Sequence, residues 1–180
     1  MDEDLDEKAG VNRPGFTLHG GVLSARPDVN CAVHVHTNNG MAIAGLKHGL
    51  RMVSQQAIRF YQRIGYHAYE GITEDFAERE RIKKDLGKNR AMIMHNHGLL
   101  TVGKTARETF VLMKALLDAA DIQLKLEAIG SELVEVPRRL RQDCGAIRAS
   151  RQRPRQRRLD GLLARARWYR YELSGIEVFT

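Results

Sequence analysis

The sequence lacks any apolar run near the roughly 18 residues that a membrane-spanning helix needs. Its N-terminus, MDEDLDEKAG, is acidic, whereas a secretory signal peptide begins basic and continues apolar. It contains only two cysteines, Cys31 and Cys144, which do not form a CxxC pair, and this argues against a disulfide framework. We therefore expect a cytoplasmic protein without a membrane segment.

The 180 residues are enough for one sizeable domain, and 43% hydrophobic and 28% charged residues are typical of a soluble globular protein. The net charge of +7 is unevenly distributed along the chain. Residues 138–180 contain twelve arginines, four acids and no lysine, whereas residues 1–137 are close to neutral. This change in composition predicts a domain at 1–137 followed by an arginine-rich tail at 138–180.

Two interpretations of the tail are open. Arginine-rich segments bind phosphate-rich partners by releasing counterions, but no nucleic-acid motif accompanies the charge here. The aromatic residues Trp168, Tyr169 and Tyr171 follow the densest arginines instead of alternating with them. We therefore favour a solvated extension with a short helix near 159–173 over a nucleic-acid-binding tail.

Helical and extended segments alternate in residues 1–137. The patterns predict helices at about 17–25 and 39–47. A third helix is expected between Thr73, which can cap it, and Gly87, which follows its end. A fourth, long helix begins at the capping box formed by Thr105 and Glu108 and ends at Gly130. They predict strands at 31–37 and in RIGYHAYEG, AMIMH and LLTVG, with a strand or loop near RMVSQQA. Strands separated by helices indicate an α/β domain, with one sheet covered by helices.

His34 and His36 lie two positions apart in the expected strand CAVHVHT. Because side chains alternate across a strand, both imidazoles project to one face, about 7 Å apart along the chain. Cys31, Val33 and Val35 then face the core. Two imidazoles at this spacing can reach one metal ion.

A second pair, His95 and His97, ends the strand AMIMH, and Gly98 allows a sharp turn after it. A third nitrogen from this strand end would complete a three-histidine site with one open coordination position, as in catalytic divalent metal sites. A buried histidine is more commonly a packing or hydrogen-bonding residue. Spacing alone leaves a metal site and a packing role equally open.

The runs VNRPGFTLHGGVLSARPDVNCAVHVHT, YHAYEG and HNHGLLTVGKTARETF closely resemble the class II aldolase and adducin family over about residues 11–130. The sequence of these runs resembles the adducin head and its bacterial relatives more than the sugar-phosphate aldolases. The resemblance implies a three-layer α/β/α domain with a largely antiparallel central sheet, and a homo-oligomer, commonly a tetramer. It also implies that the chain, which begins almost at VNRPGF, lacks part of the family's N-terminal portion.

The resemblance also implies site residues. In the family's enzymes, a zinc or similar divalent ion takes two ligands from the HxH strand. The third ligand is the histidine that directly precedes the glycine of a His-Gly turn. These ligands correspond to His34, His36 and His97 in this chain, and His95 is left as a packing residue.

The acid–base residues are less completely matched. The aldolase tyrosine that donates a proton falls near His67, so the resemblance implies His67 as an acid–base group, with Tyr69 and Glu70 as neighbouring alternatives, although a surface role is favoured for Glu70. A structural role stays open for each. Alignment on His19 puts Gly15 where the family's aldolases carry a catalytic carboxylate, so the usual general base is absent.

The leading hypothesis is a divalent-metal-dependent aldolase or epimerase-like enzyme that stabilises the enediolate of a small, sugar-like hydroxy-carbonyl substrate. That substrate is expected to be unphosphorylated, because the family's phosphate-binding portion is missing. The alternative is a catalytically inactive, adducin-head-like domain that acts through self-association or protein binding. The missing carboxylate favours the alternative, whereas the three histidines favour the enzyme.

Overall fold

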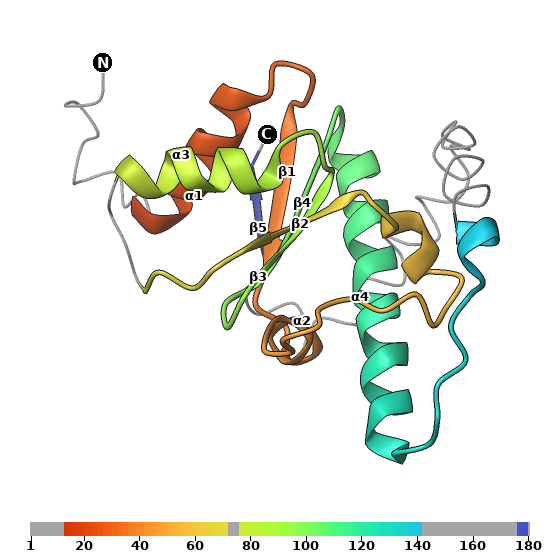
Figure 1. Cartoon of the computed structure of the whole chain (residues 1–180). Coiled ribbons are helices and arrows are strands. Elements are labelled where there is room, and N and C mark those ends of the chain that lie inside the picture. The colour runs from red at the N-terminus through yellow and green to blue at the C-terminus, as the bar shows by residue number, and fades with distance from the viewer. Residues whose placement is uncertain (1–12, 72–75, 142–175, 180) are drawn as a thin grey trace.

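The structure, a computed structural model, describes residues 13–71, 76–141 and 176–179. Its described strands form one five-stranded sheet in the order β2-β3-β4-β1-β5 (Figure 1). The strands are β1 (Cys31–Val35), β2 (Ile64–His67), β3 (Ala91–Met94), β4 (Gly98–Gly103) and β5 (Ile176–Phe179). Strands β2 and β3 are parallel and the other neighbours are antiparallel, which confirms the largely antiparallel sheet.

Helices cover both faces of the sheet. Helices α1 (Arg13–Ala25) and α3 (Phe76–Leu86) lie against each other on one face (Figure 1). Helices α2 (Asn38–Ala44) and α4 (Ala106–Ile129) lie on the other face, with the short 3-10 helix η2 (Ala57–Phe60) packed against α4. The expected three-layer α/β/α arrangement is therefore confirmed.

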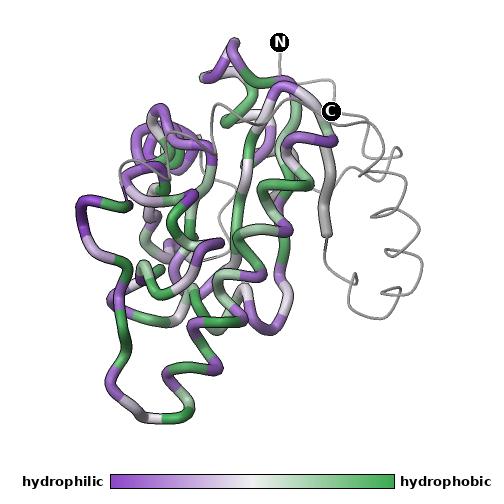
Figure 2. The backbone as a smooth tube through the Cα atoms, turned by 90° about the vertical axis from the view of Figure 1, so that its right-hand side faces the viewer, coloured by the Kyte–Doolittle hydropathy of each residue, from purple (hydrophilic) through white to green (hydrophobic). Residues whose placement is uncertain are grey.

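The alternation of β1 side chains separates two hydrophobic cores. Cys31, Val33 and Val35 are buried with the apolar residues of α2 and α4, as predicted. Ala32 belongs to the second core, between the sheet and helices α1 and α3. Along the tube in Figure 2, hydrophobic segments run through the central strands, while hydrophobic and hydrophilic segments alternate along the helices.

Helix α4 begins and ends where the local sequence predicts. The Thr105 hydroxyl accepts a hydrogen bond from the Glu108 N–H at 3.1 Å, and the Glu108 carboxylate accepts one from the Lys104 N–H at 2.9 Å. The first bond satisfies a donor that the first helical turn leaves without an intrahelical partner, and the second ties the Glu108 side chain to the residue before the cap. Gly130 then ends the helix in the left-handed conformation, with φ of 73°.

Other boundaries differ from the sequence-based expectations. Helix α1 begins at Arg13, earlier than expected, and β1 ends at Val35 because Thr37 caps α2 through a hydrogen bond from the Gly40 N–H. Helix α2 ends at Ala44, three residues earlier than expected, and RMVSQQA forms bends that lead into η2. The Thr73 cap and the short helix near 159–173 lie outside the described residues.

Strand β5, within the arginine-rich segment, was not predicted. Its four residues pair antiparallel with β1. A four-residue segment carries too little periodicity to be recognised as a strand, and the open edge of β1 supplies the backbone donors and acceptors that β5 uses. Among the described helices, none is long and apolar enough to cross a membrane.

Candidate metal centre

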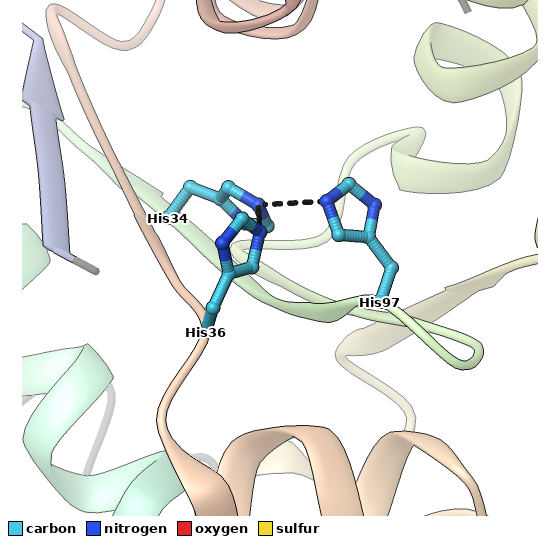
Figure 3. A group of neighbouring side chains, drawn as sticks. All are labelled: His34, His36 and His97. Atoms are coloured by element: carbon cyan, nitrogen blue, oxygen red, sulfur yellow. Dashed lines mark hydrogen bonds between the residues drawn. The ribbon is translucent and has the colours of Figure 1, made fainter. Parts of the chain in front are cut away.

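Three histidines converge at one end of the sheet. His34 lies in β1, His36 follows the end of that strand, and His97 lies in the turn between β3 and β4. Nε2 of His34 is 2.7 Å from Nε2 of His36 and 3.3 Å from Nε2 of His97. In Figure 3 the three rings point toward one another, and one ligand atom from each lies within 4.8 Å of the others. The structure therefore brings together the three residues that the resemblance implied.

The antiparallel pairing of β1 with β4 produces this convergence. His34 is opposite Leu100 and Val35 is opposite Leu99, so the turn before β4 returns beside the histidines. Gly98 is required at this point, because an added Cβ would lie less than 3.0 Å from the Val35 carbonyl oxygen and 2.9 Å from Cδ2 of His36.

The turn that carries His97 also needs an unusual backbone conformation. Asn96 has φ of 55°, in the left-handed region that asparagine tolerates better than most residues. Its N–H donates to the Ala44 carbonyl at 3.1 Å, which ties the turn to helix α2. The His97 N–H donates to the Met94 carbonyl at 3.0 Å. These bonds hold the ring of His97 next to the other two.

Hydrogen bonding defines the tautomer of His34. Its Nδ1 is 2.9 Å from the Leu99 carbonyl oxygen, and because a carbonyl only accepts, Nδ1 carries the proton and donates. The Nε2 lone pair then faces His36 and His97. Histidine ligands of metals are commonly oriented by such a bond to their second nitrogen.

Burial keeps the imidazoles of His34 and His97 in the form that can bind a metal. Desolvation, with smaller contributions from the neighbouring His97 and His36, lowers the pKa of His34 to about 3. Desolvation followed by repulsion from His36 also lowers the pKa of His97. Both side chains are therefore neutral at pH 7, and neutral imidazole is the form that coordinates metals.

The donor set fits a divalent ion with nitrogen ligands. Two imidazoles bound to a tetrahedral zinc at 2.0–2.1 Å have their nitrogens roughly 3.3 Å apart. The separation of the His34 and His97 nitrogens is 3.3 Å, and that of the His34 and His36 nitrogens is shorter, 2.7 Å. Three protein ligands would leave a fourth position for substrate or water.

His67 and Tyr69 occupy different environments. His67 ends β2 and is only 2% exposed, and its Nδ1 lies 2.7 Å from a carboxylate oxygen of Asp85. Its Nε2 lies 3.8 Å from Glu78 and 3.9 Å from Glu70. Tyr69, in contrast, is 53% exposed. The structure thus places His67 inside a group of carboxylates and Tyr69 on the surface.

The two remaining histidines near the site have packing contacts. His95 lies 3.0 Å from the Ala44 carbonyl oxygen through Nδ1 and stacks on the Tyr66 ring with centroids 5.8 Å apart, in agreement with its expected packing role. His19 on α1 meets the His34 ring edge-on at 6.4 Å, and burial lowers its pKa to about 4.

Sequence reasoning named Glu70 but missed the two other carboxylates near His67, Glu78 and Asp85. Glu78 and Asp85 are seven residues apart on α3, so two helical turns place them on one face, a periodicity visible in the sequence. Nothing in the local sequence indicates that this face lies over the end of β2.

Comparison with known proteins identifies the family. The sequence profile described as "Class II Aldolase and Adducin N-terminal domain" matches residues 2–124. The chain therefore belongs to the class II aldolase and adducin family, as the resemblance of its motifs implied.

Individual relatives agree with this assignment. A Pseudomonas aeruginosa protein, whose name assigns it provisionally to the class 2 aldolases, is 38% identical over 133 residues, which are 74% of this chain and 51% of that protein. Rat alpha-adducin is 42% identical over 117 residues, which are 64% of this chain and 16% of alpha-adducin. The chain thus spans about half the length of the first relative and a small part of the second.

Solved structures show the same fold. An aldolase II superfamily protein from Pseudomonas syringae is 35% identical, with a TM-score of 0.77 over 86% of this chain and 62% of that one. L-fuculose 1-phosphate aldolase from Glaciozyma antarctica is 26% identical, with a TM-score of 0.65 over 76% of this chain and 51% of the aldolase. The chain therefore has the α/β class II aldolase fold.

Proposed function

We propose that the domain binds one divalent metal ion through His34, His36 and His97 and acts as an aldolase or epimerase-like enzyme on a small hydroxy-carbonyl compound. The observation that carries the proposal is the convergence of three imidazole Nε2 atoms from β1 and the β3–β4 turn. Membership of the class II aldolase family supports the same function. The all-nitrogen ligand set favours zinc over magnesium or calcium.

The proposed reaction assigns different roles to the metal ion, the residues that orient its ligands and the proton-transfer group. A divalent ion at this site would supply Lewis-acid stabilisation to the substrate's carbonyl oxygen. The Leu99 carbonyl holds the His34 ring in its ligand orientation. His67, buried at the end of β2, is the proposed proton-transfer group, and the more exposed Tyr69 is the second candidate for this role. The family likeness also supports a homo-oligomer.

A second function is favoured by a specific observation. The identity of 42% to alpha-adducin, together with glycine at position 15 instead of the family's carboxylate, supports a domain that acts through association without turnover. In that case the three histidines would be packing residues, and no stoichiometric metal would be retained.

Metal content separates the two functions. Wild type, His36→Ala and His97→Ala are purified, dialysed and measured by elemental analysis, with His48→Ala as the matched control. His48 is also a histidine, but its Nε2 lies 2.9 Å from Glu127, outside the three-histidine cluster. We expect about one divalent ion per chain in wild type and in His48→Ala, and loss of the ion in the other two variants. Folded wild type without stoichiometric metal would refute the enzyme function and leave association as the proposal.

A further inference from the structure

His67 is the only sequence-predicted acid–base residue that is buried, and it is held by a carboxylate. Its Nδ1 lies 2.7 Å from Oδ2 of Asp85, and its side chain is 2% exposed, while that of Asp85 is 33% exposed. Because an ionised carboxylate only accepts hydrogen bonds, Nδ1 of His67 is the donor. The proton on Nδ1 leaves Nε2 as the nitrogen that can take up or release a proton.

Close packing between β2 and α3 makes this hydrogen bond possible. An added Cβ on Gly65 would lie less than 3.0 Å from the Asp85 carbonyl oxygen, so only glycine allows the end of α3 to approach the strand this closely. Gly65 and His67 are two positions apart in β2 and therefore share a face of the sheet. The helix that covers Gly65 thus carries Asp85 to the imidazole.

His67 and His34 lie on the same side of the sheet. His67 is opposite Met94 and His34 is opposite Leu100, and both Met94 and Leu100 belong to the core between the sheet and helices α1 and α3. The His67 carbonyl also accepts a hydrogen bond from the His95 N–H at 2.8 Å, in the turn that carries His97. His67 therefore lies on the same face of the sheet as His34, and its backbone is hydrogen-bonded to the turn that carries His97.

Two further carboxylates face Nε2 of His67. Glu78 lies 3.8 Å away and is 9% exposed as a whole residue, and Glu70 lies 3.9 Å away. Arg81 binds Glu70 through both Nε and Nη2, which lowers the Glu70 pKa and largely neutralises its charge. Together with Asp85 at Nδ1, Glu78 is able to stabilise an imidazolium at His67. At these distances neither glutamate forms a hydrogen bond with Nε2.

We propose that Asp85 is a positioning residue for His67, and that the Asp85–His67 pair, with Glu78 beside it, takes the place of the family carboxylate that glycine replaces at position 15. This inference rests on the proposed function. In the proposed step, Nε2 of His67 accepts the proton from the carbon next to the substrate carbonyl. The C–H bond breaks, the N–H bond forms, and the electron pair passes to the carbonyl oxygen. The proton on Nε2 exchanges with solvent water, and return of a proton or deuteron from Nε2 to carbon then completes the hydrogen exchange with water as the only co-reactant.

Hydrogen exchange of a small hydroxy-ketone tests the step. Zinc-loaded wild type, His67→Gln and Asp85→Ala are incubated with dihydroxyacetone in deuterium oxide, and deuterium uptake at carbon is followed by NMR. We expect uptake by wild type, about a 100-fold slower rate in His67→Gln, and at least a tenfold slower rate in Asp85→Ala. Glu80→Gln is the matched control, because Glu80 lies on the same helix and its side chain is 74% exposed. This control should exchange like wild type.

A second measurement does not depend on turnover. In metal-free protein, two-bond ¹H–¹⁵N spectra show which nitrogen of His67 carries the proton. We expect the proton on Nδ1 in wild type and a mixture of tautomers in Asp85→Ala. A purely structural role for Asp85 would lower stability in Asp85→Ala but leave the tautomer unchanged.

The outcomes separate this inference from the proposed function. If wild type retains zinc and exchanges deuterium but Asp85→Ala matches it in both rate and tautomer, the positioning role is refuted and the metal site stands. If wild type retains zinc but shows no exchange, proton transfer by His67 is refuted. If wild type retains no zinc, the proposed function fails and this inference fails with it.

Discussion

Replacing Gly98 with alanine should both destabilise the protein and disrupt the three-histidine cluster. The new Cβ would lie less than 3.0 Å from the Val35 carbonyl oxygen, 2.9 Å from Cδ2 of His36 and 3.3 Å from Cε1 of His34. The carbonyl belongs to the paired strand β1, so it cannot rotate away as the end of a flexible side chain can. Either β1 and β4 separate locally or both imidazoles move.

The magnitude follows from the number and kind of these contacts. Forcing extra atoms into a packed interior costs about 1–3 kcal/mol, and a conflict with backbone inside a sheet belongs near the upper limit. The smaller conformational entropy of unfolded alanine returns only about 0.4–1 kcal/mol. We expect a decrease of about 2 kcal/mol in the free energy of unfolding. Zinc retention should fall as well, because either movement shifts His34 and His36 relative to His97.

Urea unfolding of metal-free protein and elemental analysis of dialysed protein measure the two effects separately. Gly21→Ala is the matched control, because the nearest atoms to its Cβ would be side-chain atoms of Arg79, with Cγ at 3.2 Å and Cβ at 3.3 Å, and not the backbone of a paired strand. The higher helix propensity of alanine and the small displacement of Arg79 act in opposite directions, so we expect a change of less than about 1 kcal/mol. If Gly98→Ala unfolds like wild type and retains zinc, the close approach of the turn to β1 is not what holds the site together.

Three further predictions concern a helix cap, a turn and a buried titratable group. Thr105→Ala should lower the free energy of unfolding by about 1 kcal/mol, because the Thr105 hydroxyl accepts a hydrogen bond from the Glu108 N–H. Thr105→Ser keeps a hydroxyl and should restore the stability. Equal urea unfolding curves for wild type and both variants would contradict this role of the cap. Elemental analysis should show loss of zinc from Asn96→Val but not from Asn96→Gly, because the φ of 55° at this position is unfavourable for valine. Equal zinc content in the two variants would show that the turn conformation does not position His97. Burial lowers the pKa of His19 from the ordinary histidine value of 6.5 to about 4 in the folded protein, so the unfolded state binds more protons between these two pH values. As the pH falls from 6.5 to 4, His19 should therefore lower the free energy of unfolding of the metal-free protein by about 3 kcal/mol. Urea unfolding of His19→Gln over the same pH range should lack this decrease.

Features that depend on neighbouring residues could be predicted from the sequence. Alternation in CAVHVHT placed His34 and His36 on the side opposite Cys31, Val33 and Val35, because the geometry of a strand requires only adjacent residues. The cap at Thr105 and the end at Gly130 follow from backbone groups within one helical turn. Spacing alone did not distinguish His97 from His95 as the third ligand. The resemblance to the family made that choice, and the structure places the His97 ring, and not that of His95, in the cluster.

Features that depend on pairing between distant segments required the tertiary structure. The Leu99 carbonyl that defines the His34 tautomer lies 65 residues away along the chain, and β1–β4 pairing brings them together. Asp85 reaches His67 because glycine at position 65 lets helix α3 approach β2 closely. The amino-acid sequence alone therefore determined which histidines are candidate ligands and the local conformation of the segments that carry them. Only sheet pairing and helix packing decided which nitrogen of each buried imidazole is available, because that depends on a partner far away in sequence.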